Sequence, residues 1–84
     1  MDLFHHESLM TADALVAVLQ EKSPVLRQTA IQRLYSIVDQ CWSEISDAIP
    51  LIEELSEDEN FESHEIAAAV ASKIFFHLEE YDAN

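Results

Sequence analysis

Carboxylates dominate the side chains of this sequence that could do chemistry, and calcium binding is the first chemistry that they suggest. The 84 residues include 17 Asp and Glu but 4 Lys and Arg. The richest segment, residues 57–65, lacks the alternating Asp pattern and the Gly of a calcium loop; with Asp58 as first ligand, Ala69 takes the twelfth position. Adjacent carboxylates such as Glu53 and Glu54 point to different parts of a helix surface, with nothing apolar to separate their pKa values. The carboxylates therefore predict neither a calcium site nor an acid–base pair.

The cysteine and the histidines are the other candidate metal ligands. Cys41, His5, His6, His64 and His77 show no spacing typical of a zinc site. The adjacent His5 and His6 could hold a metal weakly, or could simply be surface histidines. Because the chain has no Gly, it also has no nucleophile elbow and no phosphate-binding loop. We expect no catalytic residue, no metal site and no cofactor, and hence no enzyme.

The negative charge is concentrated in the second half of the chain. The formal net charge is −13, and residues 43–84 contain twelve acidic residues but a single basic one, Lys73. Such a chain repels phosphate backbones and anionic lipid headgroups, so nucleic acid and membrane surfaces are poor partners. Two interpretations stay open for the acidic half: a well-solvated helix surface, or a docking face for a basic partner. The candidate contacts of the second interpretation are Glu53, Glu57, Asp58 and Glu62.

Three aromatic side chains could anchor a partner, since aromatic residues dominate interface hot spots. Trp42 and Phe75 lie on apolar faces of expected helices, which favours packing between helices over an external contact. Phe76 lies off the main apolar stripe of its helix, so we predict that it is the aromatic residue available to a partner. An uncovered face near Phe76 could also drive self-association.

The strongest helix signal covers residues 63–78. Apolar residues recur there at three-and-four spacing and make one broad stripe. Ser63 is a good N-cap, and Glu65 places a negative charge in the first turn. A helix with this much apolar surface must be covered by other elements.

Three further helices can supply that cover. Thr11 is the expected N-cap of a helix that runs to about Gln20. Ser23 followed by Pro24 is a strong start signal for a second helix, with Trp42 near its end. The third stretch runs from Glu44 to about Glu57, and Pro50 inside it indicates a late start, with Ser46 as cap, or a kink near residues 45–46.

The expected fold is all-α, with about four helices arranged as two stacked antiparallel helical hairpins, as in a fragment of an α-solenoid of the HEAT or TPR type. Residues 1–10 are expected to form a flexible extension, and residues 11–84 a single helical-hairpin domain. The residues that we expect to hold this structure together are apolar: Leu34, Ile37, Val38, Trp42, Ile45, Ile49, Ile52, Val70, Ile74 and Phe75. With one cysteine, no signal-peptide pattern and no long apolar run, an intracellular, soluble protein is expected.

Four stretches in unbroken order suggest a family: residues 41–46 (CWSEIS), 49–55 (IPLIEEL), 57–61 (EDENF) and 68–78 (AAVASKIFFHL). Together they resemble the extreme N-terminus of the 26S proteasome non-ATPase regulatory subunit 1 family, the large helical scaffold subunits of the regulatory particle base. The resemblance covers about Thr11 to Asp82. Two features depart from the family pattern: the first ten residues have no clear counterpart, and Glu79 stands where the family commonly has a Gly that closes the helix.

The resemblance implies a non-catalytic scaffold that acts in ubiquitin-dependent protein degradation, in the cytoplasm and the nucleus, with other regulatory-particle subunits as partners. In that family the N-terminal region is a rod of stacked helix pairs, followed by a ring of helical repeats and a tail. This chain resembles the first pairs of the rod. The residue-based alternative is a free-standing acidic helical adaptor that binds a basic partner segment.

Overall fold

The computed structural model describes residues 11–83, and every regular element in that range is a helix. The elements are α1 (Ala12–Val18), α2 (Pro24–Ile45), the 3-10 turn η2 (Ser46–Ala48), α3 (Ile49–Glu57) and α4 (His64–Ala83). The prediction of an all-α protein is confirmed. The extension predicted at residues 1–10, with its pair His5 and His6, lies outside the described residues.

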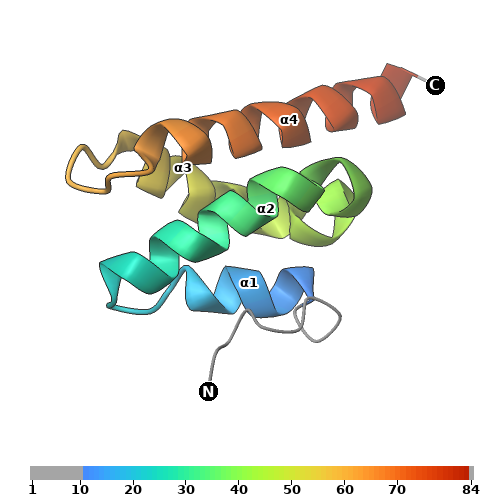
Figure 1. Ribbon diagram of the computed structural model, residues 1–84. Coiled ribbons are helices and arrows are strands. Elements are labelled where there is room, and N and C mark those ends of the chain that lie inside the picture. Colours follow the sequence, from blue (N-terminus) through green and yellow to red (C-terminus); the bar gives the residue numbers. More distant parts are fainter. Residues whose placement is uncertain (1–10, 84) are drawn as a thin grey trace.

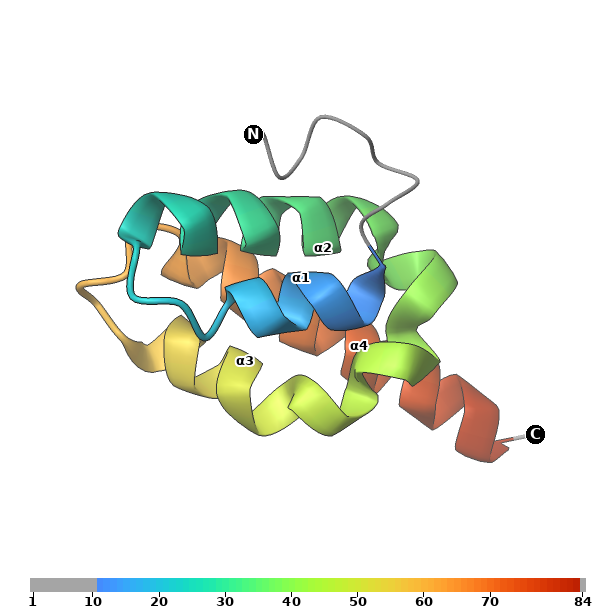
Figure 2. The same cartoon turned by 90° about the horizontal axis from the view of Figure 1, so that it is seen from below.

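The helices lie in layers. Helix α4 packs on both α2 and α3, and α1 packs on α2. Figure 1 shows α4 on one side of α2 and α1 on the other; viewed from below in Figure 2, α1 lies between α2 and α3, with α4 behind them. Helix α1 runs opposite to α2, and α3 runs opposite to α4 (Figure 1).

Two helix starts are fixed by the expected caps. The Thr11 hydroxyl accepts from the Ala14 amide at 3.1 Å, and the Ser23 hydroxyl accepts from the Leu26 amide at 3.3 Å. Pro24 then occupies the first turn of α2, where its missing N–H leaves no bond unmade. Both starts agree with the prediction, because a capping bond depends on residues close in sequence.

The described residues form three uninterrupted helical stretches, where four separate helices were expected. The 3-10 turn joins α2 to α3 without a loop, so residues 24–57 are helical throughout. The direction changes where Cys41 (φ −123°, ψ 16°), Ile45 (φ −108°, ψ 5°) and Ala48 (φ −91°, ψ 3°) leave the α-helical region. The departure at Ile45 agrees with the predicted alternative of a kink near residues 45–46. Pro50 falls in the first turn of α3, as the late-start alternative predicted, but Ala48 is the N-cap. The proposed Ser46 cap is wrong: its hydroxyl instead donates to the Ser43 carbonyl at 3.1 Å.

Helix α4 is longer than the predicted 63–78. It begins directly after Ser63, whose carbonyl accepts a hydrogen bond from the Ala67 amide at 3.0 Å. At its other end the helix continues to Ala83. Glu79 and Glu80 are good helix formers, and this part of the sequence has neither Gly nor Pro to end a helix. Glu79 therefore continues α4, at the position where the resemblance implied a Gly that closes the helix.

One apolar core runs through the layers. Of the ten residues predicted to hold the structure, six are buried, and Ile37, Trp42 and Ile49 pack partly buried at its edge. The buried apolar set is Ala12, Leu15, Leu19, Ala30, Ile31, Leu34, Val38, Cys41, Ile45, Ile52, Leu55, Phe61, Ala67, Val70, Ala71 and Ile74.

Two aromatic residues differ from the expectation. Phe75 is 44% exposed, because the buried face of α4 is made by Ala67, Val70, Ala71 and Ile74, and residue 75 lies to one side of it. Phe61, placed by sequence in an acidic connector, is 2% exposed. The connector turns back through the bond from the Phe61 amide to the Asp58 carbonyl (2.9 Å), which allows the Phe61 ring to enter the core.

Candidate functional site

The four acidic residues predicted to contact a basic partner lie on α3 and on the connector that follows it. Glu53 and Glu57 are exposed one turn apart on α3, and Glu62 is exposed on the connector. Two of the four carboxylates already bind groups of this chain: Asp58 Oδ1 accepts from the Asn60 amide at 2.9 Å, and Glu62 Oε2 accepts from Gln28 Nε2 at 3.1 Å. Their contact with a partner remains a prediction.

A second set of polar and aromatic side chains joins α2 to α4. Asp39 on α2 is the centre of this set, which we call the Asp39 cluster: Tyr35, Asp39, Trp42, Lys73, Phe76, His77 and Tyr81. Asp39 Oδ1 lies 2.8 Å from His77 Nε2, and Asp39 Oδ2 accepts from Lys73 Nζ at 3.2 Å. Because a carboxylate can only accept, Nε2 is the nitrogen of His77 that carries the proton in this bond.

The rings of the Asp39 cluster hold its polar groups in place. Trp42 stacks on His77, with ring centroids 5.5 Å apart and planes 10° from parallel, and it meets Tyr81 edge-on at 6.1 Å. Phe76 meets His77 edge-on, with ring centroids 5.6 Å apart. Lys73 Nζ lies 5.1 Å from the centre of the Tyr35 ring, a cation–π distance. The predicted contact residue Phe76 is 57% exposed at the edge of this cluster.

The cluster changes the pKa of Asp39. The hydrogen bond from His77, followed by the one from Lys73, lowers the pKa of Asp39 below its usual value of 3.8. The Asp39 side chain is 54% exposed, so the cluster lies at the surface of the molecule. The cluster links α2 to α4, because each polar partner of Asp39 comes from the facing helix.

Cys41 is the one thiol in the chain. It is buried, and burial, with a smaller effect of nearby Glu44, raises the pKa of the Cys41 thiol. A thiol with a raised pKa is a poor nucleophile. Cys41 also departs from helical geometry (φ −123°, ψ 16°), which marks a kink in α2.

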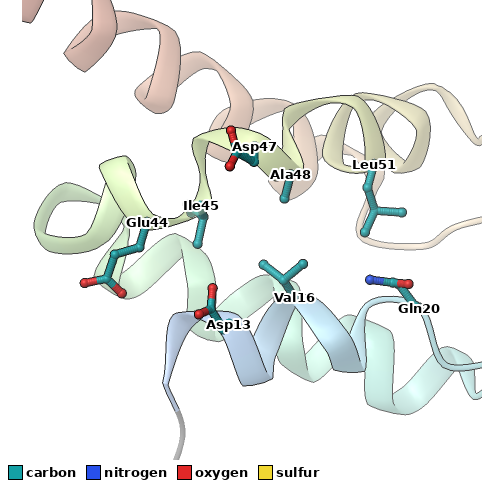
Figure 3. Close-up of a pocket in the computed structure, with 8 residues that line it drawn as sticks. All are labelled: Asp13, Val16, Gln20, Glu44, Ile45, Asp47, Ala48 and Leu51. Carbon is teal, nitrogen blue, oxygen red and sulfur yellow. The ribbon is translucent and has the colours of Figure 1, made fainter.

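A groove lies on the opposite side of the molecule from α4, between α1 and the segment that runs from the end of α2 through η2 into α3. It has a volume of about 310 Å³. Figure 3 shows the residues that line it. On one side are Asp13 and Val16 of α1 and Gln20 just after it; on the other are Glu44 and Ile45 at the end of α2, Asp47 and Ala48 of η2, and Leu51 of α3. The groove combines apolar side chains with three carboxylates.

Within residues 11–83 no three His, Cys, Asp or Glu side chains gather as a metal site would require. Over the same residues no helix has the length and apolar character needed to cross a membrane.

Neither the Asp39 cluster nor the groove was predicted from the sequence. The available signal was helical spacing: Lys73 and His77 lie four residues apart on one face of α4, and Asp13 and Val16 lie three residues apart on one face of α1. Spacing indicates which residues share a face but does not indicate which element that face meets.

The comparisons with known proteins agree on one family. A family model described as 26S proteasome subunit RPN2, N-terminal domain, matches residues 10–84. The chain is 42% identical over 76 residues to the 26S proteasome regulatory subunit RPN2 of Saccharomyces cerevisiae, which covers 90% of this chain and 8% of the relative. It is 46% identical over 72 residues to the 26S proteasome non-ATPase regulatory subunit 1 homolog A of Arabidopsis thaliana (83% of this chain, 7% of the relative). It is 41% identical over 75 residues to the Drosophila melanogaster 26S proteasome non-ATPase regulatory subunit 1 (89% and 7%). The chain thus spans less than a tenth of the length of these relatives.

Proposed function

The chain belongs to the family of the 26S proteasome subunit RPN2 N-terminal domain, and from this premise we propose that it is a non-catalytic scaffold segment of the proteasome regulatory particle. In this role it contributes to ubiquitin-dependent protein degradation, in the cytoplasm and the nucleus. The observation that carries the proposal is the family match over residues 10–84, nearly the whole chain.

The packing of the helices supports a geometric mechanism. Helix α4 packs on α2 and α3, and the core continues from α1 to α4. This arrangement suits two stacked antiparallel helix pairs at one end of a solenoid, in which each pair covers the next. The segment would hold neighbouring subunits at a fixed distance and orientation, with no bond made or broken. Its partners would be other subunits of the regulatory particle.

Affinity purification tests the proposal. The protein that carries this sequence is tagged at its own locus, purified under native conditions and analysed by mass spectrometry. We expect regulatory-particle subunits to be recovered. The matched control is the Ile74→Asp variant, whose core is disrupted and which should lose these partners. Purification of the folded protein without any proteasome subunit would refute the scaffold proposal.

A free-standing adaptor for a basic segment is the second candidate, and the exposure of Glu53 and Glu57 on one face of α3 favours it. It predicts binding to a basic peptide that weakens steeply as salt is raised, since exposed charges are screened over about 10 Å at 0.1 M ionic strength. Binding that is insensitive to salt, or absent, would leave the scaffold as the better account.

Self-association of the isolated chain through α4 is also proposed, because Phe75, Phe76 and Tyr81 are exposed on this helix. Sedimentation of the chain across a range of concentrations distinguishes a monomer from a dimer. If these aromatic residues form the contact, Phe76→Ser should shift the equilibrium toward the monomer.

A further inference from the structure

The groove between α1 and the segment from the end of α2 to α3 lies at the edge of the core, where apolar residues that pack against the core alternate with exposed polar ones. On α1, Leu15 and Leu19 point into the core, whereas Asp13, Val16 and Gln20 line the groove. Figure 3 shows Val16 on one side of the groove facing Ala48 on the other, and Leu51 of α3 projecting toward Gln20. The groove is therefore a surface left between helices that are each anchored elsewhere.

The floor of the groove is apolar. Ile45 is buried there, and Val16, Ala48 and Leu51 are half-buried and pack against the core. Covering such a surface with a further apolar side chain is favourable, by about 25 cal/mol for each Å² removed from water. At about 310 Å³, the space suits one or two large side chains rather than a whole folded domain.

The rim of the groove carries charge of one sign. Asp13, Glu44 and Asp47 supply three carboxylates, and none of the eight lining residues is a Lys or Arg. Asp13 and Glu44 lie at one end, away from Gln20 and Leu51 at the other (Figure 3). An apolar floor beside an acidic end is complementary to a segment with an apolar side chain followed, about one turn later, by a positive charge.

We propose that this groove binds a basic amphipathic helix of a partner protein. An apolar side chain of that helix lies between Val16 and Leu51, and a Lys or Arg one turn along it pairs with Asp13 and Glu44. A helix in a groove between helices is a recurrent mode of peptide recognition, with anchors at three-and-four spacing. The inference rests on the proposed function to the extent that a scaffold must offer contact surfaces, and it adds the place and the chemistry of one such contact.

A second copy of this chain is a poor occupant. With a net charge of −13, two copies repel each other, and the chain has four Lys and Arg in all. Several of these are already engaged within the chain; Lys73 pairs with Asp39, for example, and Arg27 lies over the Phe61 ring at 5.6 Å. A partner with its own basic residues fits the rim better.

The test uses the 84-residue chain and a fluorescein-labelled synthetic peptide of Leu, Ala and Lys, designed as a basic amphipathic helix. Binding is measured by fluorescence anisotropy near physiological salt. The groove variant is Asp13→Asn/Glu44→Gln, and the matched control is Glu53→Gln/Glu57→Gln, which removes the same charge from the exposed face of α3. Two lost surface pairs should weaken binding about fivefold in the groove variant, while the control stays near the unmodified chain.

A second pair of variants tests the apolar floor. Val16→Ala removes methyl groups from the groove and raises helix propensity, so α1 should still form. Val25→Ala, at an exposed position of α2, is its control. We expect Val16→Ala to bind the peptide about two- to threefold more weakly and Val25→Ala to bind it unchanged. Circular dichroism of each variant confirms that the helices remain.

Three results would overturn the inference. Equal weakening in the groove and control variants would indicate non-specific charge attraction, and greater weakening in the Glu53/Glu57 control would place the contact on α3. A groove variant that changes self-association of the chain without peptide would make a second copy the occupant. Because the assay contains this chain and the peptide alone, its failure leaves the proteasome proposal standing. A failed affinity purification would count against the proteasome proposal and not against the groove.

Discussion

Asp39 has two hydrogen-bond partners, and both come from the facing helix. His77 and Lys73 approach its two carboxylate oxygens from α4, and Trp42 stacks on the His77 ring. These two bonds join Asp39 to residues that lie 34 and 38 positions further along the chain. Such a contact is exposed, so it adds orientation between α2 and α4 more than it adds stability.

Replacing His77 with Phe should raise the pKa of Asp39. The substitution keeps a ring against Trp42 but removes the donor that contributes most to the lowered pKa. The pKa of Asp39 should rise toward 3.8, while Lys73 still holds it partly down. A carbon-detected NMR titration of the Asp39 carboxyl measures it. Lys73→Met should raise the pKa of Asp39 as well, and an unchanged pKa in His77→Phe would show that the His77 bond is not formed.

The pH dependence of stability follows from the same shift. Because the pKa of Asp39 is lowered in the folded state, the ionised carboxylate stabilises the folded chain. This stabilisation is fully present above pH 3.8 and is lost as the pH falls through the folded-state pKa. Urea unfolding at a series of acidic pH values should therefore show less loss of stability below pH 3.8 in Asp39→Asn than in the unmodified chain. Parallel curves for the two proteins would contradict this expectation.

The thiol of Cys41 should react slowly in the folded chain. Burial raises its pKa, so at pH 8 little thiolate is present, and little of it is accessible. We expect modification by Ellman's reagent to be at least about tenfold slower than in guanidinium chloride. Equal rates in the two conditions would show that Cys41 is exposed in solution.

At the scale of elements, local signals decide where helices begin. Thr11 and Ser23 cap their helices through bonds to residues three positions away, and Pro50 falls in a first turn. These features were predicted because nothing distant is needed to form them. The join between α2 and α3 was predicted in part: a kink near residues 45–46 was one of two alternatives, and Ile45 departs from helical geometry there, but the direct passage from α2 through η2 into α3 was not expected.

Loss of the Ser23 cap should destabilise the chain measurably. Ser23→Ala leaves the Leu26 amide without its acceptor and should cost about 1 kcal/mol of unfolding free energy. Ser36→Ala is the matched control within α2: its hydroxyl donates to the Arg33 carbonyl at an exposed helical position, so we expect a change within about 0.5 kcal/mol. Chemical denaturation measures both, and equal effects would rule out the cap as a source of stability.

The whole molecule is a short stack of helices with one continuous core and a strong negative charge. Helical periodicity predicted most of that core, including Leu34, Val38 and Ile74. It did not predict that Phe61 is buried or that Phe75 is exposed, because burial at those positions depends on which element lies opposite. The Asp39 cluster and the groove were missed for the same reason, since both exist where faces of different helices meet.

A charge in the centre of this core should prevent folding. Ile74 is fully buried on α4, and an unpaired carboxylate there costs several kcal/mol. Ile74→Asp should lose its cooperative thermal transition by circular dichroism. Ser72→Asp, at an exposed position of the same helix, should melt nearly as the unmodified chain does. A normal melting curve for Ile74→Asp would refute the core described above.

The central claim is that this helical stack works within a proteasome regulatory particle. The most direct measurement is glycerol-gradient sedimentation of a native extract, with the endogenous protein that carries this sequence followed by antibody. We predict that it sediments with large particles that hold proteasome peptidase activity. Sedimentation of all of it as a small free protein, well away from that activity, would contradict the account.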